Sequence, residues 1–440
     1  MTGLDRNQTP KTRPMPQNRT ALVASLDIGT SKIACMIARL RPCPPSEALR
    51  GRTHAVELIG YSQIQSRGVK AGGVVDLAEC EQAVRHAVAL AERMAKVRVE
   101  SVLLSVSGGR LHGQLIEAAA EIRGGAVTAA DIGRVTSTGM HHATGEGRTV
   151  LHALPVGYSL DGVKGIRDPR GMVARQFGVD MNVVTVEATV AKNLMLVVER
   201  CHLNVEAMAA SPYVAGLSVL TDDEADIGAA VVEMGAGTTT IATYSGGRFI
   251  HASGFAVGGH HITMDLARGI SACIADAERI KTLYGTVLTG GSDARELMSV
   301  PAAGDNERDA PQIVSRATIA NIVRQRAEEI FEMVRDRLAD SPFAAEPKAR
   351  VVLSGGASQL TGTLELATQI LGRPVRIGRP LGFGRLPSEA KSASFAVPSG
   401  LLVYPQYAHL EHVEPRHTRQ LRTGTDGYFG KVGRWLREGF

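Results

Sequence analysis

One pattern of residues occurs twice in the chain, near its start and just past its middle. The two stretches are LDIGTSKIACMI at residues 26–37 and VEMGAGTTTIAT at residues 232–243. In each, an apolar run ends in an acidic residue, an apolar residue and glycine, and hydroxyl residues lead into a second apolar run. Apolar runs on both sides of a glycine turn predict a β-hairpin. The repetition predicts a duplicated lobe, with two similar halves that face one ligand.

A third glycine turn, VVLSGGASQLTG at residues 351–362, follows an apolar strand and opens a predicted helix. A glycine hairpin by itself is usually only a tight turn. Three turns in the order hairpin, hairpin and strand–GG–helix are better explained by one shared phosphate site. With 440 residues, 44% of them hydrophobic, the chain is long enough to build two large lobes around such a site.

The first glycine turn carries residues suited to phosphate. Glycine lets backbone N–H groups come close to an anion, and hydroxyls and lysine add further donors. We therefore expect Gly29, Thr30, Ser31 and Lys32 to contact phosphates. Asp27 ends the preceding strand, where a carboxylate can hold Mg²⁺ through water.

The second glycine turn supplies a matching arm. Its donors are Gly235, Gly237, Thr238 and Thr239, and Glu233 takes the place of the first turn's aspartate. Two such arms on opposite sides of a cleft can clamp a triphosphate.

Charge and cysteine content narrow the classes of partner and compartment. The formal net charge is +5, but 44 acidic residues lie among 49 lysines and arginines, which suits an acidic partner or an anionic membrane and does not indicate nucleic acid. The five cysteines form no CxxC pair, as is typical of a reduced cytosolic chain.

Residues 1–20 are polar and predict a disordered tail without a signal peptide. No apolar run approaches the roughly 20 residues that a spanning helix needs.

The last residues, 427–440, predict an amphipathic helix that lies on a membrane. Wound at about 100° per residue, one side carries apolar residues and the other carries cations. The membrane-binding set is Tyr428, Phe429, Lys431, Val432, Arg434, Trp435, Leu436, Arg437 and Phe440. Aromatic rings suit the acyl boundary and cations suit anionic headgroups. The alternative is a helix that docks on its own domain, but the polar linker expected at residues 404–426 favours the membrane.

The three turns resemble the phosphate-one, phosphate-two and adenosine motifs of the superfamily of actin, DnaK-type chaperones and sugar kinases. Within it, five stretches resemble the bacterial FtsA cell division family: SRGVKAGGVVDL, VAKNLMLVVERCHL, GGHHITMDLARG, DAERIKTLYG and the terminal RWLREGF. The resemblance covers the chain from about residue 21 to its end. It implies an α/β, actin-like ATPase fold, in which two lobes of duplicated ribonuclease-H-like domains surround a nucleotide cleft.

The resemblance also implies a domain order. The first lobe core is expected at residues 21–96 and 176–206, with a family-specific inserted subdomain at 97–175. The second lobe is expected at 207–403 and includes an FtsZ-binding subdomain at about 248–335. A flexible linker at 404–426 and the membrane helix at 427–440 complete the chain.

The nucleotide site implied by the resemblance holds ATP and Mg²⁺. Glu278 and Lys281 are similar to the family's ribose and adenine contacts, and Gly355 and Gly356 let the backbone pass close to the nucleoside. By spacing alone, Glu278 and Lys281 would be an ordinary surface ion pair on a helix.

Two departures from the family pattern bear on hydrolysis. Glu233 stands where the family usually has aspartate, and His202 stands where a glycine is expected. Between residues 189 and 203, Glu199 is a candidate base by residue type only. These features predict ATP binding with slow or negligible hydrolysis.

The resemblance implies a protein at the cytoplasmic face of the inner membrane, at the division site. Its expected partners are the FtsZ C-terminal tail, further copies of itself, later divisome proteins and anionic lipids, with no nucleic acid. Arg316, Arg324 and Arg326 are candidates for a groove that takes the acidic FtsZ tail. The alternatives are a metabolic kinase, a chaperone-like ATPase or a pilus-assembly ATPase of the same superfamily.

Overall fold

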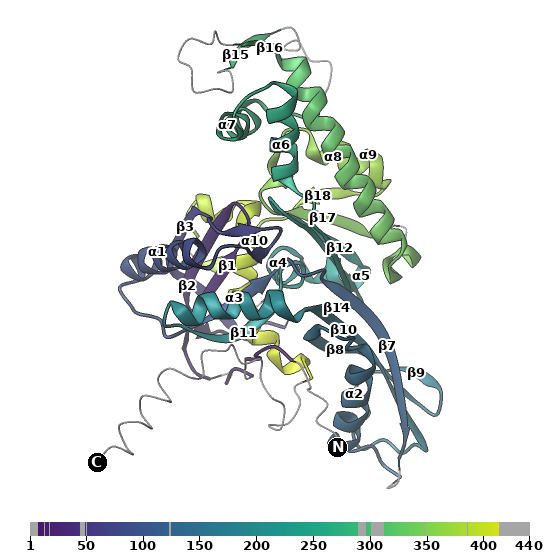
Figure 1. Ribbon diagram of the computed structural model, residues 1–440. Coiled ribbons are helices and arrows are strands. Elements are labelled where there is room, and N and C mark those ends of the chain that lie inside the picture. Colours follow the sequence, from purple (N-terminus) through teal and green to yellow (C-terminus); the bar gives the residue numbers. More distant parts are fainter. Residues whose placement is uncertain are drawn as a thin grey trace, which may run out of the picture.

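A computed structural model describes most of the chain. The described residues are 8–12, 14–16, 18–44, 49, 51–122, 125–288, 296–300, 312–346, 348–384 and 386–412. They form two lobes with a third unit that extends below the second lobe in Figure 1. The predicted membrane helix at 427–440 lies outside the described residues.

The first lobe is built on a six-stranded sheet in the order β11-β6-β1-β2-β3-β19. β1 and β2 form the predicted hairpin, and β6 and β11 run parallel to β1. The strands are β1 (Ala21–Ile28), β2 (Lys32–Pro42), β3 (His54–Gln65), β6 (Ser101–Val106), β11 (Asn204–Ala210) and β19 (Phe383–Gly384), with a small hairpin of β4 (Val69–Lys70) and β5 (Gly73–Val74) beside them.

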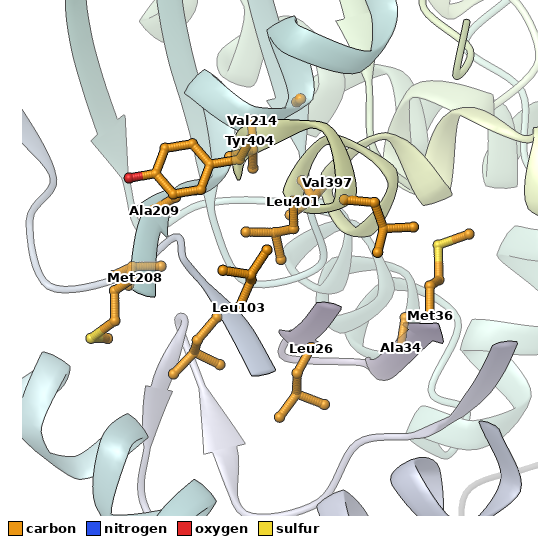
Figure 2. Close-up of a cluster of buried hydrophobic side chains, with 14 of the residues drawn as sticks. Leu26, Ala34, Met36, Leu103, Met208, Ala209, Val214, Val397, Leu401 and Tyr404 are labelled. Atoms are coloured by element: carbon orange, nitrogen blue, oxygen red, sulfur yellow. The ribbon is translucent and has the colours of Figure 1, made fainter. Parts of the chain in front are cut away.

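Helices cover both faces of this sheet. They are α1 (Leu77–Ala95), α3 (Ala188–Arg200), α4 (Ser211–Val219) and α10 (Ala396–Val403). α1 begins where the Asp76 carboxylate accepts hydrogen bonds from the N–H groups of Ala78 and Glu79. Figure 2 shows side chains from β1, β2, β6, β11, α4 and α10 gathered in one buried core.

The second lobe repeats the strand order of the first. Its sheet runs β18-β17-β12-β13-β14, so that an antiparallel meander is again flanked by two parallel strands. This order confirms the duplication predicted from the two glycine hairpins. The strands are β12 (Ala229–Met234), β13 (Thr239–Ser245), β14 (Arg248–Phe255), β17 (Arg350–Ser354) and β18 (Val375–Ile377).

Helices pack on the second sheet and extend above it. The elements are α5 (Asp222–Ile227), α6 (Gly259–Gly269), α7 (Ile274–Tyr284), α8 (Arg316–Ala339) and α9 (Thr363–Leu371), with the 3-10 turns η2 (Pro342–Ala345) and η3 (Ala357–Gln359). α6, α7 and the start of α8 rise to the top of Figure 1, where β15 (Leu297–Val300) pairs with β16 (Gln312–Ser315).

The inserted unit consists of β7 (His112–Glu121), α2 (Ala129–Ala143), β8 (Arg148–Leu160), β9 (Val163–Ile166) and β10 (Gln176–Glu187). The predicted bounds of 97–175 are therefore wrong at both ends. β6 pairs with β1 in the first lobe, whereas β10 is the central strand of the inserted sheet, between β7 and β8. Through one bridge, Ser253↔His112, the inserted sheet continues the sheet of the second lobe.

The chain returns to the first lobe earlier than predicted. Residues 386–403 were expected in the second lobe, but α10 packs on α4, β1 and β2. Three 3-10 turns surround it: η4 (Glu389–Lys391), η5 (Ala393–Phe395) and η6 (Tyr404–Leu410). The reason is hydrophobic, because every residue of α10 is buried and its apolar side chains belong to the first lobe's core.

The N-terminal segment and the start of the expected linker are also packed, contrary to prediction. Gln8, Thr9 and Thr12 are buried, and Thr9 donates its N–H to the carbonyl of Val150 at 3.0 Å. At the other end, Glu411 pairs with His152 of the same strand, β8, and the N–H of His412 donates to the carbonyl of Ala153 at 2.9 Å. The polar composition that predicted disorder instead supplies partners for a buried network.

That network centres on the carboxylate of Glu411. Lys11 Nζ lies 2.5 Å from it, His152 Nδ1 lies 2.7 Å from it and the Tyr404 hydroxyl donates to it at 2.8 Å. His152 Nε2 accepts from the N–H of Ala210 at 2.8 Å, so the imidazole is neutral and its Nδ1 donates. Burial opposes ionisation of Glu411, but Lys11 and His152 outweigh it and lower its pKa to about 2.

In the described part of the chain, no helix is both long enough and apolar enough to cross a membrane.

We predict that Glu411→Gln lowers the free energy of unfolding by about 3 kcal/mol, because it leaves Lys11 as a buried charge without its partner. Urea unfolding followed by circular dichroism measures the loss. Glu100→Gln, at an exposed carboxylate, is the matched control and should change stability little. Equal stabilities of the two variants would contradict the prediction.

Candidate nucleotide site

The predicted phosphate arms line one cavity of about 420 Å³ between the two lobes. It contains nearly all of the predicted site residues. Those that line it are Asp27, Gly29, Thr30, Ser31, Lys32, Glu233, Gly235, Gly237, Thr238, Glu278, Lys281 and Gly356.

The first arm is the turn between β1 and β2. It is closed by a hydrogen bond from Gly29 N–H to the carbonyl of Lys32 at 3.0 Å. A Cβ at Gly29 would come within 2.9 Å of that carbonyl, so the turn requires glycine. The Lys32 ammonium donates to the carbonyl of Ser394 and lies 4.6 Å from the centre of the Phe395 ring. These contacts fix the lysine at the base of the cavity.

The second arm is closed in the same way, by a bond from Gly235 N–H to the carbonyl of Thr238 at 2.9 Å. The start of α6 is tied to this arm. The N–H groups of Gly259 and His260 donate to the carbonyls of Gly235 and Ala236 at 2.9 and 2.8 Å. The second arm is thus held by α6 as well as by its own hairpin.

The two arms touch each other at the centre of the cavity. A Cβ at Gly237 would lie 2.3 Å from Thr30 Oγ1, so the two lobes approach this closely only because residue 237 is glycine. Thr30 Oγ1 also accepts a hydrogen bond from Gly72 N–H at 3.2 Å. The β4–β5 hairpin therefore joins the same contact.

Two carboxylates and one lysine share the base of the cavity. Burial raises the pKa of Asp27, although the Ser105 hydroxyl, which donates to it at 2.5 Å, and Lys32 oppose the shift. Burial, with a smaller contribution from Asp27, raises the pKa of Glu233 to about 8. Burial also lowers the pKa of Lys32, against the attraction of the two carboxylates. The ligand-free site therefore carries less negative charge than its composition indicates.

Glu278 and Lys281, the residues predicted to contact the nucleoside, form an ion pair in the wall of the cavity. Lys281 Nζ lies 2.7 Å from Glu278 and donates to Thr263 Oγ1 at 2.8 Å and to the carbonyl of Gly259 at 3.1 Å. Burial opposes ionisation of Glu278, but Lys281 and Thr263 outweigh it and hold the pKa of this carboxyl below its usual value. The Lys281 side chain is 12% exposed and that of Glu278 is 50% exposed, so only the lysine of this pair is enclosed.

Two predicted site residues lie behind the cavity wall. Thr239 is fully buried and its hydroxyl donates to the carbonyl of Val257 at 2.8 Å. Gly355 has φ of +85° and lies against β12, where a Cβ would meet the carbonyl of Met234 at 2.4 Å. Both support the arms from behind and are not brought to the cavity.

Sequence reasoning missed several residues that line the cavity. They are Ser107, Ser211, Ala236, Gly259, His260, Thr282, Leu283, Gly285, Ala357, Gln359, Leu360, Thr361, Ser394 and Val397. Ten of them lie inside the stretches quoted above but were not named there as contacts, and only Ser107, Ser211, Ser394 and Val397 lie outside those stretches. Ser211, by contrast, begins α4 and is brought to the cavity only by the packing of the first lobe.

The site fits a hydrated Mg²⁺ better than a metal held only by side chains. Among the described residues, no three histidine, cysteine, aspartate or glutamate side chains gather into a metal site. Asp27 and Glu233 face the same cavity, together with hydroxyls of both arms. Mg²⁺ keeps several waters and combines one or two carboxylates with phosphate oxygens.

The arginines proposed for an acidic groove are engaged in ion pairs. Arg316 pairs with Glu296 at 2.8 Å, Arg324 pairs with Glu328 at 2.7 Å, and Arg326 pairs with Asp265 at 2.5 Å.

Comparison with known proteins decides the family. The chain is 47% identical over 432 residues to the "Cell division protein FtsA" of Agrobacterium fabrum, covering 98% of each chain. The chain belongs to the FtsA family. The family model "Cell division protein FtsA" matches residues 230–400, and the model "SHS2 domain inserted in FTSA" matches residues 108–185, close to the inserted unit described above.

Solved structures show the same fold at low sequence identity. A PilM–PilN type IV pilus biogenesis complex matches with a TM-score of 0.62 and 16% identity, covering 87% of this chain and 98% of that one. MreB5 of Spiroplasma citri bound to ADP matches with a TM-score of 0.51 and 14% identity, covering 88% and 97%. The predicted actin-like α/β fold of this FtsA family member is confirmed.

We predict that Glu233→Gln makes the nucleotide-free protein more stable than the wild type at alkaline pH. The pKa of Glu233 is about 8 when folded and about 4.5 when unfolded, so the unfolded chain loses this proton first as pH rises. The contribution of Glu233 to the free energy of unfolding is fully present below pH 4.5 and is lost as pH rises through 8. The loss is about 3 to 5 kcal/mol at full ionisation. The amide cannot ionise and removes this loss.

Thermal unfolding from pH 5.5 to 8.5, in EDTA and without nucleotide, measures the effect. Glu121→Gln, at an exposed carboxylate, should follow the wild type. If the difference between Glu233→Gln and the wild type does not grow with pH, the glutamate ionises normally and the prediction is wrong.

Proposed function

We propose that this protein binds ATP with Mg²⁺ and works as an actin-like adaptor in cell division, which assembles on the inner membrane and anchors the FtsZ ring. The proposal rests on the FtsA family and on one observation, the contact of the two phosphate arms at Gly237 and Thr30. A ligand that bridges both arms would tie the two lobes together. Nucleotide binding would therefore favour the arrangement in which the two lobes are held together.

In this proposal each part of the cavity takes a defined part of ATP. The backbone N–H groups and hydroxyls of residues 29–32 and 235–238 hold the phosphates, and Lys32 adds a positive charge. Asp27 and Glu233 hold the metal through water, and the metal neutralises phosphate charge when bound. Glu278, Lys281 and the backbone at Gly356 hold the nucleoside.

We propose that hydrolysis is slow. A general base must reach the attacking water and must be ionised at working pH. Glu233 is protonated over much of the neutral range until a cation binds, and Asp27 accepts the Ser105 hydroxyl. Glu199 lies on α3 and is not among the residues that line the cavity. The site is better suited to holding ATP than to activating water.

The unit formed by α6, α7, α8, β15 and β16 is the proposed dock for the FtsZ tail. Its surface carries Ile274, Leu297 and Ile313, which are 49%, 66% and 71% exposed. Exposed apolar side chains of this kind are suited to a protein partner. Because Arg316, Arg324 and Arg326 are paired with acidic residues, apolar contacts would contribute more to the affinity for the FtsZ tail than these positive charges would.

The proposed membrane attachment is weak for one copy and firm for a polymer. Partial interfacial burial of six apolar side chains is offset by ordering costs of about 1 kcal/mol per residue. The cations add about 2 kcal/mol near anionic lipid. A row of copies would add avidity through effective concentration. The inserted unit is the proposed surface for self-contact and for later divisome proteins.

We predict that Gly237→Ala weakens ATP binding at least about 10-fold, because the added methyl group would meet Thr30 and push the arms apart, at a cost above about 1.4 kcal/mol. Titration calorimetry with Mg²⁺ and ATP measures the affinity. Gly133→Ala is the matched control, since a Cβ there meets nothing within 4 Å. Unchanged affinity in Gly237→Ala would mean that ATP does not need the closed arms.

We predict that the full chain co-sediments with liposomes that contain phosphatidylglycerol, and does so more strongly with ATP. A chain that ends at Thr425 should stay in the supernatant because it lacks the helix, and so should the full chain with Trp435→Glu, because a negative charge then interrupts the apolar face. Liposomes of neutral lipid control for headgroup charge. Equal pelleting of the shortened chain would refute the role of the tail.

A further inference from the structure

A cavity of about 370 Å³ lies on the first lobe and shares no lining residue with the nucleotide cavity. Its walls come from residues 11–16, from β1 and β11, which are strands of the first lobe in Figure 1, and from η6. Most of the lining is apolar and includes Pro14, Met15, Pro16, Leu22 and Pro405. Leu22 is 47% exposed, so this apolar wall is open to solvent. Exposed apolar side chains that gather in this way suit an apolar partner.

One carboxylate of the lining is available to a cation. Glu206 on β11 is exposed and accepts hydrogen bonds from the hydroxyls of Thr12 at 2.7 Å and Ser101 at 3.3 Å. Within the described part of the chain, Glu206 makes no ion pair. The charge of Lys11, which also lines the cavity, is instead balanced by Glu411 at 2.5 Å. The cavity therefore suits an occupant that is both apolar and positively charged.

The described part of the chain ends beside this cavity. The N–H of His412 donates to the carbonyl of Ala153 at 2.9 Å, and the preceding residue, Glu411, holds Lys11 of the cavity lining. A further 28 residues follow His412. The remainder of the predicted linker, residues 413–426, would span about 20 Å as a random coil. The segment of residues 427–440 therefore starts within reach of the cavity.

This segment has the composition that the cavity suits. Its apolar side chains include Phe429, Trp435 and Leu436, and Lys431 and Arg434 are among its cations. Cavities that hold small ligands have volumes of about 300 to 1,000 Å³, so this one has room for one or two large side chains. The rest of the segment would lie along the surface, where its cations can reach Glu206. Because the segment is tethered, its effective concentration is about millimolar, and a weak contact is enough to populate the docked state.

We propose that this cavity holds the aromatic side of residues 427–440 of the same chain when no membrane is present. The inference rests on the proposed membrane role of these residues, because one apolar side cannot face the cavity and the lipid at once. Docking would therefore compete with lipid, and the apparent affinity for lipid would fall in proportion to the fraction of free tails. A single copy in solution would keep its aromatic residues covered until an anionic membrane draws them out.

Trp435 provides the test, because it is the only tryptophan in the chain and its fluorescence reports on the tail alone. In the full chain, without lipid or nucleotide, Trp435 should emit at a shorter wavelength and be quenched less by acrylamide than in a free peptide of residues 427–440. This shielding should not change on dilution, because the contact is intramolecular. Equal quenching in the chain and the peptide would overturn the proposal. Shielding that is lost on dilution would assign the cavity to the tail of a second copy and would also overturn it.

Two variants link the shielding to the cavity. Leu22→Glu places a charge in the apolar wall, and Glu206→Lys reverses the charge of the available carboxylate. Each should raise the quenching of Trp435 toward that of the peptide. Leu115→Glu is the matched control, because Leu115 is also a strand residue, is 49% exposed and does not line the cavity. Circular dichroism shows which variants are folded, and unchanged shielding in Leu22→Glu or Glu206→Lys, when folded, would contradict the docking.

Vesicles of phosphatidylglycerol separate the docking from the membrane role. If the tail is docked in about nine molecules of ten, its release by Leu22→Glu should raise the apparent affinity for these vesicles about 10-fold, whereas Leu115→Glu should leave it unchanged. Exposed Trp435 in the wild type, with vesicle binding intact, would overturn the docking and leave the membrane role standing. Shielded Trp435 in the wild type, with no vesicle binding even by Leu22→Glu, would support the docking and refute the membrane role.

Discussion

The close approach of two glycine turns is the contact on which the rest of the structure depends. Gly237 of the second lobe lies so near Thr30 of the first that no side chain fits between them. Around that contact, the buried Glu233 and the partly buried Asp27 and Lys32 influence one another electrostatically. Burial suppresses charge there while no ligand is present, so a cation and a polyphosphate would complete the site together.

The sequence was sufficient for the duplicated fold and for the arms, because both are local patterns. Alternating apolar runs around a glycine turn define a hairpin without help from distant residues, and the structure has both hairpins. Residues that reach the site only through tertiary packing were harder to predict from the sequence. Ser105 and Ser211 reach the cavity region through the first lobe's sheet and α4, and no spacing in the sequence joins them to the glycine turns.

The domain bounds failed for a related reason. Polarity predicted loose ends at residues 8–12 and 404–412, yet Lys11 and Glu411 satisfy each other from opposite ends of the chain. Such a pair, 400 positions apart, carries no local signature. In the same way, α10 is uniformly apolar and cannot reveal by periodicity which lobe it enters.

The inserted unit is attached to both lobes, by different means. Its strand β7 continues the second lobe's sheet at one bridge, where a Cβ on Gly113 would meet the backbone of Ala252 at 2.7 Å. Its strand β8 is fixed to the first lobe by His152 and Glu411. A rotation of one lobe against the other must therefore be absorbed within this unit or break one of its two attachments. A change in the angle between the lobes would therefore strain the inserted unit, and a partner bound there would respond to that angle without contacting the nucleotide.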